Sequence, residues 1–176
     1  MKNSIIKIVS WVLQSIDKML VALHLKTPQV VIYMDGGICS QMLMYLQGRY
    51  YAEKGINVYY DTYWFDVCGK DQYGKHPRVF ELIEMWPNIE FKTISRFKRK
   101  IFFLFFKAER KNADWLPEPK SVKRSMYLNS YWDMPSEAHK SLFSKYFDLK
   151  TASIPIKYNN KIVGGNGLII NALACM

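Results

Sequence analysis

Apolar positions follow two different spacings in the first third of this chain. The run Val30–Met34 is continuous, short and rich in β-branched and aromatic side chains, and Gly36-Gly37 follows it. This pattern predicts a buried strand that ends in a tight turn. In the segment 40–54 apolar residues cover more than one face, with Ser40 as candidate N-cap and Gly55 as terminator. That segment is predicted to be a helix covered on several sides.

Further elements follow in the same order. The sequence predicts a returning strand at 58–61, a helix at 79–86 that Pro87 ends, a third strand at 89–93, a strand beginning at Tyr127, and an amphipathic helix at 136–147 with Ser136 as N-cap. Strands that alternate with helices indicate an α/β protein with a Rossmann-like parallel sheet and flanking helices. Ligands of such sheets bind at the carboxyl ends of the strands.

Residues 1–26 show a helical apolar pattern. The apolar residues that share one face are Ile5, Ile8, Val9, Val12, Ile16, Met19, Leu20 and Leu23. Lys7, Asp17 and Lys18 interrupt any apolar stretch of about 20 residues, so a membrane-spanning helix is not expected. Charges inside the apolar region also argue against a signal peptide. Two interpretations stay open: a helix packed on the domain, or one on a membrane surface.

Positive charge is concentrated in one segment. The chain has 176 residues, about one domain, with 49% hydrophobic and 15% aromatic residues and a net charge of +10. Basic residues between Lys92 and Lys111 bracket the apolar run Ile101–Phe106. This arrangement fits an anionic membrane surface or a core strand with solvated flanks. No nucleic-acid-binding motif accompanies the charge, so nucleic acid is not expected as a partner.

The cysteines and histidines form no recognisable framework. They are Cys39, Cys68, Cys175, His24, His76 and His139. Their spacing predicts neither disulfides nor a metal site, and it favours a reducing, cytoplasmic compartment. Cys39 lies in the glycine turn, but no histidine near it in sequence would activate it as a nucleophile.

The glycine turn itself is a candidate ligand site. Residues without Cβ let backbone approach a ligand, and the N–H groups at the following helix N-terminus favour an anion such as a diphosphate. The alternative is an ordinary tight turn between a strand and a helix.

Several segments resemble the α-1,2-fucosyltransferases, glycosyltransferase family 11. Residues 36–45 (Gly-Gly-Ile-Cys-Ser-Gln-Met-Leu-Met-Tyr) are similar to that family's Gly-Gly-Leu-Gly-Asn-Gln-Met-Phe-Gln-Tyr signature. Asp61–Phe65 resembles its Asp-x-x-Trp-Phe, and Arg78–Leu82 its Arg-x-Phe-Glu-Leu. Tyr127–Trp132 resembles Tyr-Leu-Asp-Gly-Tyr-Trp, and Tyr146-Phe147 follows in the family's order. The resemblance covers about residues 30–149.

The resemblance implies the N-terminal Rossmann-like half of a GT-B glycosyltransferase. Such an enzyme moves fucose from GDP-fucose to the 2-hydroxyl of a galactoside, with inversion and without an obligatory metal or further cofactor. The substrate-binding candidates are Gly36, Gly37, Ser40 and Gln41 for the diphosphate, Asp61, and Tyr131 and Trp132 for stacking on sugar. Asp35 and Asp61 are weak candidates for the base, and no catalytic residue is assigned. A lipid-linked glycan acceptor would suit a peripheral position on the inner face of the membrane.

The family's His-x-Arg-x-Gly-Asp motif, which binds the nucleotide, does not occur in this sequence. We therefore expect a truncated form, inactive alone, with an N-terminal helix (1–26), a Rossmann-like domain (27–150) and an aberrant tail (151–176). Two alternatives stay open. One is a membrane-surface domain without enzyme activity; the other is a dinucleotide-binding protein, for which Asp61 fits but the sequence after Gly36 does not.

Overall fold

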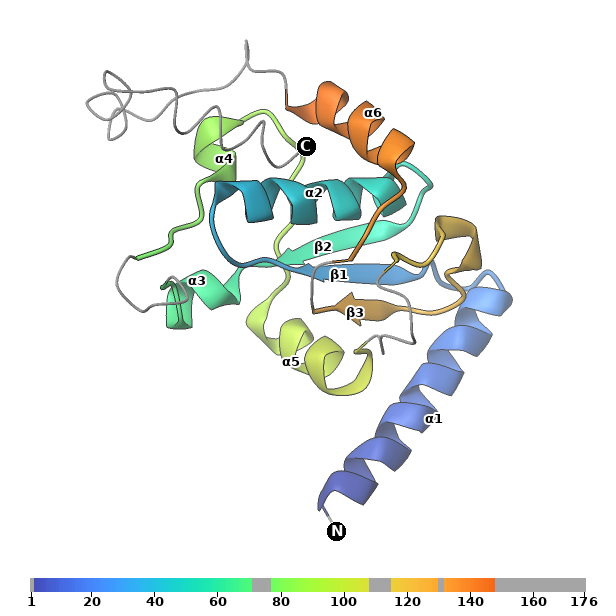
Figure 1. Ribbon diagram of the computed structural model, residues 1–176. Coiled ribbons are helices and arrows are strands. Elements are labelled where there is room, and N and C mark those ends of the chain that lie inside the picture. Colours follow the sequence, from blue (N-terminus) through green and yellow to red (C-terminus); the bar gives the residue numbers. More distant parts are fainter. Residues whose placement is uncertain (1, 71–76, 108–114, 130–131, 148–176) are drawn as a thin grey trace, which may run out of the picture. The chain divides into compact units, whose positions relative to one another are not determined.

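The computed structural model describes residues 2–70, 77–107, 115–129 and 132–147 (Figure 1). The elements in these ranges are α1 (Lys2–Ala22), β1 (Gln29–Tyr33), α2 (Ile38–Ala52), β2 (Asn57–Asp61), α3 (Tyr63–Val67), α4 (Leu82–Met85), α5 (Arg96–Phe105), a 3₁₀ turn (Pro119–Ser121), β3 (Met126–Leu128) and α6 (Ser136–Tyr146). The predictions made for His76, Tyr131 and the tail 151–176 lie outside the described residues. Across those ranges, no helix combines the length and the apolar content that crossing a bilayer requires.

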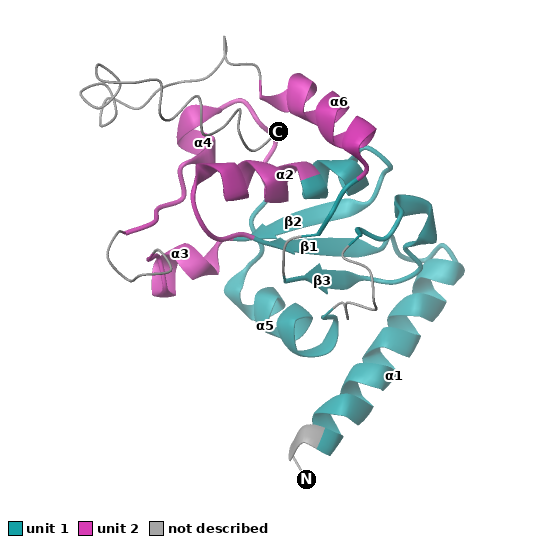
Figure 2. Ribbon diagram, viewed as in Figure 1, with its two compact units in different colours: residues 1–33, 47–61, 92–134 teal, residues 34–46, 62–91, 135–176 magenta. Residues whose placement is uncertain are grey.

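The chain forms two compact units (Figure 2). The first, here called the sheet unit, comprises residues 1–33, 47–61 and 92–134. The second, here called the glycine-turn unit, comprises residues 34–46, 62–91 and 135–176. Helix α2 begins in the glycine-turn unit and ends in the sheet unit. Each unit is therefore described by itself.

The sheet unit contains a three-stranded parallel sheet with the strand order β2-β1-β3. In its register, Val31 of β1 lies opposite Tyr59 of β2 and Tyr127 of β3. The apolar run of β1 is buried, as expected for a central parallel strand with both faces covered. The predicted α/β class with a Rossmann-like parallel sheet is confirmed.

One predicted strand was wrong, and one open interpretation is excluded. Residues 89–93 do not form a strand, because pairing with β2 is limited to backbone bonds that Tyr60 makes with Lys92 and Ile94. A core strand was one of two interpretations of the apolar run 101–106, but all of that run except Phe106 lies in helix α5, which ends at Phe105. The Ser95 side chain caps α5 by accepting a hydrogen bond from the backbone N–H of Lys98.

Helices α1 and α5 pack together in the sheet unit (Figure 1). Phe102 of α5 and Phe106, which follows the helix, form a buried cluster with Val31 and Tyr127 of the sheet, and Leu13 of α1 packs against it. The predicted N-terminal helix is confirmed, and one of its residues reaches this core.

Both predicted N-caps were wrong. Helix α2 begins at Ile38, so Ser40 lies within its first turn, and the backbone carbonyl of Gly37 accepts the hydrogen bond from the N–H of Gln41. Helix α6 has Pro135 at its N-cap, and Ser136 is its first helical residue.

Candidate functional site

The glycine turn after β1 has a left-handed backbone. Gly36 has φ of 72°, a conformation that a residue with a side chain adopts only with strain. A Cβ added at Gly37 would lie 3.3 Å from Nη1 of Arg78. The guanidinium group of Arg78 therefore lies directly against the turn, and a larger residue at position 37 would crowd it.

Gln41 holds this turn to a segment far along the chain. Its Nε2 donates hydrogen bonds to the carbonyl oxygens of Gly36 (3.3 Å) and Val79 (2.9 Å). Its Oε1 accepts hydrogen bonds from the backbone N–H groups of Glu81 (2.9 Å) and Leu82 (3.1 Å). Both hydrogens of the amide and both lone pairs of its oxygen are thus used, and the side chain is fully buried.

This arrangement corrects the length of the predicted helix 79–86. Only Leu82–Met85 is helical, as α4. The carbonyl of Val79 and the N–H of Leu82, which a helix beginning at residue 79 would pair internally, bind the Gln41 amide instead. Gln41, a candidate ligand contact from sequence, faces the interior and positions the turn.

Arg78 is the residue in this region that sequence reasoning did not select. Its side chain is exposed, and within the described ranges its guanidinium makes no ion pair. Its place as the first residue of the Arg-x-Phe-Glu-Leu segment could have indicated it from the sequence. A guanidinium group beside a turn at a helix N-terminus can bind an anion with two oxygen atoms.

The other candidates around the turn are partly accessible. Ser40, Asp35 and Cys39 are half-buried. The backbone N–H of Asp35 lies 3.4 Å from the sulfur of Met44. Among the described residues, no group of histidine, cysteine and acidic side chains has the arrangement of a metal site.

Asp61 ends β2 in the sheet unit and is committed to an internal network. Its Oδ2 accepts hydrogen bonds from Nε of Arg99 (2.7 Å) and from the hydroxyl of Tyr127 (2.6 Å). Only 1% of Asp61 is exposed. Burial, followed by the hydrogen bond to Asp61, raises the pKa of Tyr127 well above its ordinary value. A buried carboxylate held by two donors suits a structural role better than that of a general base.

Trp132 is also buried in the sheet unit, where its backbone carbonyl accepts a hydrogen bond from Nε2 of Gln47 (2.8 Å). Its burial favours packing over the stacking on sugar expected from sequence.

In the glycine-turn unit, Tyr45 contacts the rings of Tyr146 (centroids 5.7 Å apart) and Phe147 (5.5 Å). Two of the segments that resemble the fucosyltransferases, residues 36–45 and Tyr146-Phe147, are therefore in contact.

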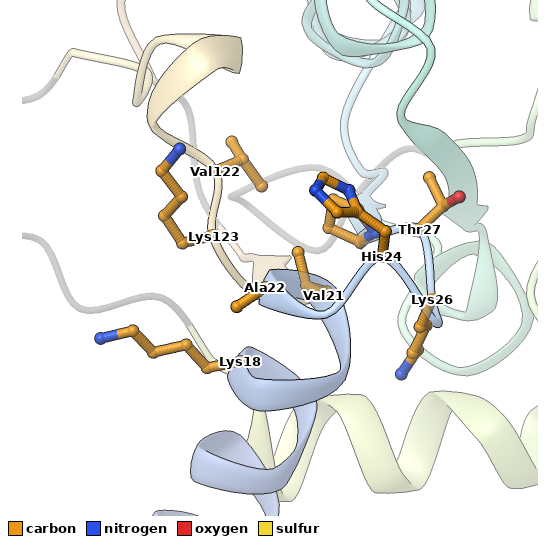
Figure 3. A pocket seen from close by; sticks show the side chains of 9 residues that line it. Lys18, Val21, Ala22, His24, Lys26, Thr27, Val122 and Lys123 are labelled. Atoms are coloured by element: carbon orange, nitrogen blue, oxygen red, sulfur yellow. The ribbon is translucent and has the colours of Figure 1, made fainter.

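The described residues of the sheet unit also line cavities that the sequence did not indicate. One, of about 650 Å³, has Lys18, His24 and Lys123 among its lining residues (Figure 3). Its members Pro28 and Lys123 precede β1 and β3, so it lies at the amino-terminal edge of the sheet. A second cavity, of about 410 Å³, lies between the end of α2 and the 3₁₀ turn. Parallel sheets bind ligands at the opposite edge.

Comparisons with protein-family models, with curated proteins and with solved structures found no match.

Proposed function

We propose that this chain is the N-terminal Rossmann-like half of a GT-B glycosyltransferase similar to the α-1,2-fucosyltransferases. Its ligands would be GDP-fucose and a galactoside acceptor, and the glycine turn would contact the donor diphosphate. The supporting observation is the Gln41 clamp, which joins two resembling segments that are far apart in the sequence, the glycine turn and Arg78–Leu82.

The chemistry of the turn also supports this proposal. Sugar transfer from a nucleotide requires positive charge and hydrogen-bond donors at the departing diphosphate. The first turn of α2 presents backbone N–H groups, and Arg78 adds a cation beside Gly37. Gln41 contributes indirectly, because it determines where both groups lie.

A dinucleotide-binding protein is the weaker alternative. Such proteins use a carboxylate at the end of the second strand to accept hydrogen bonds from ribose hydroxyls. Asp61 has that position, but its Oδ2 already accepts hydrogen bonds from Arg99 and Tyr127 in a buried site. A ribose would have to displace an internal ion pair.

The test is calorimetric titration of the full chain with GDP-fucose, GDP and guanosine. Guanosine lacks the diphosphate, so it isolates the part of the affinity that the turn would supply. We expect Arg78→Ala to weaken GDP binding about tenfold or more, the value of a charge-assisted hydrogen bond, and to leave guanosine binding unchanged.

Arg96→Ala is the matched control, because Arg96 is exposed at the start of α5, in the other unit. It should leave GDP affinity unchanged. Equal affinity for GDP and guanosine, or no binding of GDP-fucose and GDP at all, would remove the support for a nucleotide-sugar site at this turn.

A further inference from the structure

Several contacts between helix α1 and the rest of the sheet unit are made by polar side chains. The Ser10 hydroxyl and Nε2 of Gln14 both donate to the carbonyl oxygen of Phe105, at 2.8 Å and 2.6 Å. One turn further, the carboxylate of Asp17 is buried and accepts hydrogen bonds from the backbone N–H and the hydroxyl of Ser125. Lys26 pairs with the same carboxylate. The inward face of α1 therefore includes three polar side chains, Ser10, Gln14 and Asp17, that are hydrogen-bonded to the rest of the sheet unit, beside Leu13, which packs against its core.

Another face of α1 is apolar and exposed. Its exposed members are Ile5, Ile8, Val9, Val12, Ile16 and Met19, and Leu23 follows directly after the helix. Ile8 is 63% exposed, and Trp11, at the border of this face, is 71% exposed. A surface helix of a globular domain normally has the reverse orientation, with apolar residues toward the core. Eight large apolar side chains, these seven and Trp11, gathered along one helix and its end cannot be treated as scattered exposed residues.

Charge around this face has a single sign. Lys7 and Lys18 are exposed, and because they are separated by about three helical turns they return to the same side of α1. Asp17 is the one acidic residue of α1, and it is buried and paired with Lys26. The neighbouring helix α5 has no acidic residue, and it exposes Phe97 (77%) together with basic side chains.

We infer that the exposed face of α1, defined above, lies in the interface of an anionic phospholipid bilayer, with α5 contributing beside it. Apolar side chains would enter the acyl boundary, Trp11 would lie at the headgroup level, and Lys7 and Lys18 would contact anionic headgroups. The helix would lie parallel to the membrane plane. A bilayer fits better than a second copy of the chain, because two copies would bring like charges together. This inference does not depend on the proposed function.

The test is flotation of the full chain with vesicles of phosphatidylcholine alone and of phosphatidylcholine mixed with phosphatidylglycerol. We expect binding to the anionic vesicles that weakens as salt is added. A blue shift of tryptophan fluorescence should accompany binding and should be lost in Trp11→Phe. Equal binding to both kinds of vesicle, or binding to neither, would overturn the inference.

A matched pair of substitutions tests the apolar face. Ile8→Glu should lower vesicle affinity about tenfold or more, because it removes apolar area and adds a repelled charge. Ile83→Glu makes the same change at an exposed position of α4 (43% exposed) and should leave affinity within about twofold. Equal losses in the two variants would contradict a site on α1. Circular dichroism of each variant verifies that it is folded.

The lysines are tested separately. Lys7→Ala and Lys18→Ala should each lower affinity for anionic vesicles about fivefold, whereas Lys140→Ala on α6 should have no such effect. Size-exclusion chromatography with light scattering tests the second-copy alternative. A dimer that Ile8→Glu dissociates, without vesicle binding by the original chain, would replace the bilayer with a second copy of this protein.

Discussion

The hydroxyl of Tyr127 on β3 donates a hydrogen bond to the carboxylate of Asp61 on β2 across 2.6 Å, although β1 lies between these two strands. Arg99 of α5 binds the same carboxylate oxygen at 2.7 Å. Three elements, β2, β3 and α5, are therefore held together by one buried acidic group. Because Asp61 is almost completely buried, losing either donor leaves its charge less compensated inside the protein.

Removing the Tyr127 hydroxyl should destabilise the protein measurably. Tyr127→Phe retains the ring but leaves the carboxylate with one donor fewer, and we expect the free energy of unfolding in urea to fall by about 1.5–3 kcal/mol. Tyr50→Phe, at a half-buried position on α2, is the control and should change it by less than about 0.5 kcal/mol. Similar values for the two variants would show that the Asp61 bond contributes little.

Stability should fall in alkaline solution because of Tyr51 and Tyr127. Burial raises the pKa of both hydroxyls above the ordinary value of 10.0. Above that pH the unfolded chain releases these protons while the folded chain retains them, so folded stability is complete below pH 10 and is lost as pH rises. Each tyrosine should contribute a slope of about 1.4 kcal/mol per pH unit.

Urea unfolding at a series of pH values above neutrality measures this slope. The double variant Tyr51→Phe and Tyr127→Phe should show a shallower loss of stability than the original chain. Parallel pH curves for the two proteins would mean that other groups cause the alkaline loss.

Replacing Gln41 should loosen the glycine turn. Gln41→Leu leaves the buried N–H groups of Glu81 and Leu82 without their acceptor, and we expect a loss of about 3 kcal/mol in unfolding free energy. Hydrogen exchange at the Glu81 and Leu82 amides should accelerate before global unfolding. Gln29→Leu, a half-buried glutamine on β1, should leave those two amides protected. Unchanged exchange in Gln41→Leu would contradict the clamp.

Gly48 of α2 should tolerate no side chain. A Cβ added there would lie 2.3 Å from the hydroxyl oxygen of Tyr60, whose ring is buried. Gly48→Ala should therefore cost about 1–3 kcal/mol, although alanine favours helices by about 1 kcal/mol over glycine. In the Tyr60→Leu background the cost should be smaller, because the hydroxyl and the ring atoms that the added Cβ would meet are gone. A cost that does not depend on residue 60 would rule out this contact as the cause.

Local patterns in the sequence were sufficient for much of the fold. The apolar run at 30–34, the glycine pair and the helical pattern after it correctly predicted β1, the turn and α2, and strand β2 followed. These predictions hold because strand and helix periodicity depends on residues within about one or two turns of one another. The parallel arrangement followed from the alternation of strands with helices.

Partners of buried polar groups could not be predicted in this way. Gln41 binds Val79, 38 positions away, and Asp61 binds Tyr127, 66 positions away. No local pattern indicates that one carboxylate or amide, rather than another, will be used internally, so both residues were taken from sequence as ligand contacts. Arg78 was overlooked for the same reason, since its importance arises only from its contact with Gly37.

The orientation of α1 shows the same division most clearly. Its sequence alone determined that it is an amphipathic helix with one apolar face. Only the tertiary structure decided which face meets the protein, because Ser10 and Gln14 bind a carbonyl group of Phe105, which lies 95 positions from Ser10. Amphipathicity is a property of one helix, whereas the choice of its buried face depends on the hydrogen-bonding groups that the rest of the fold presents to it.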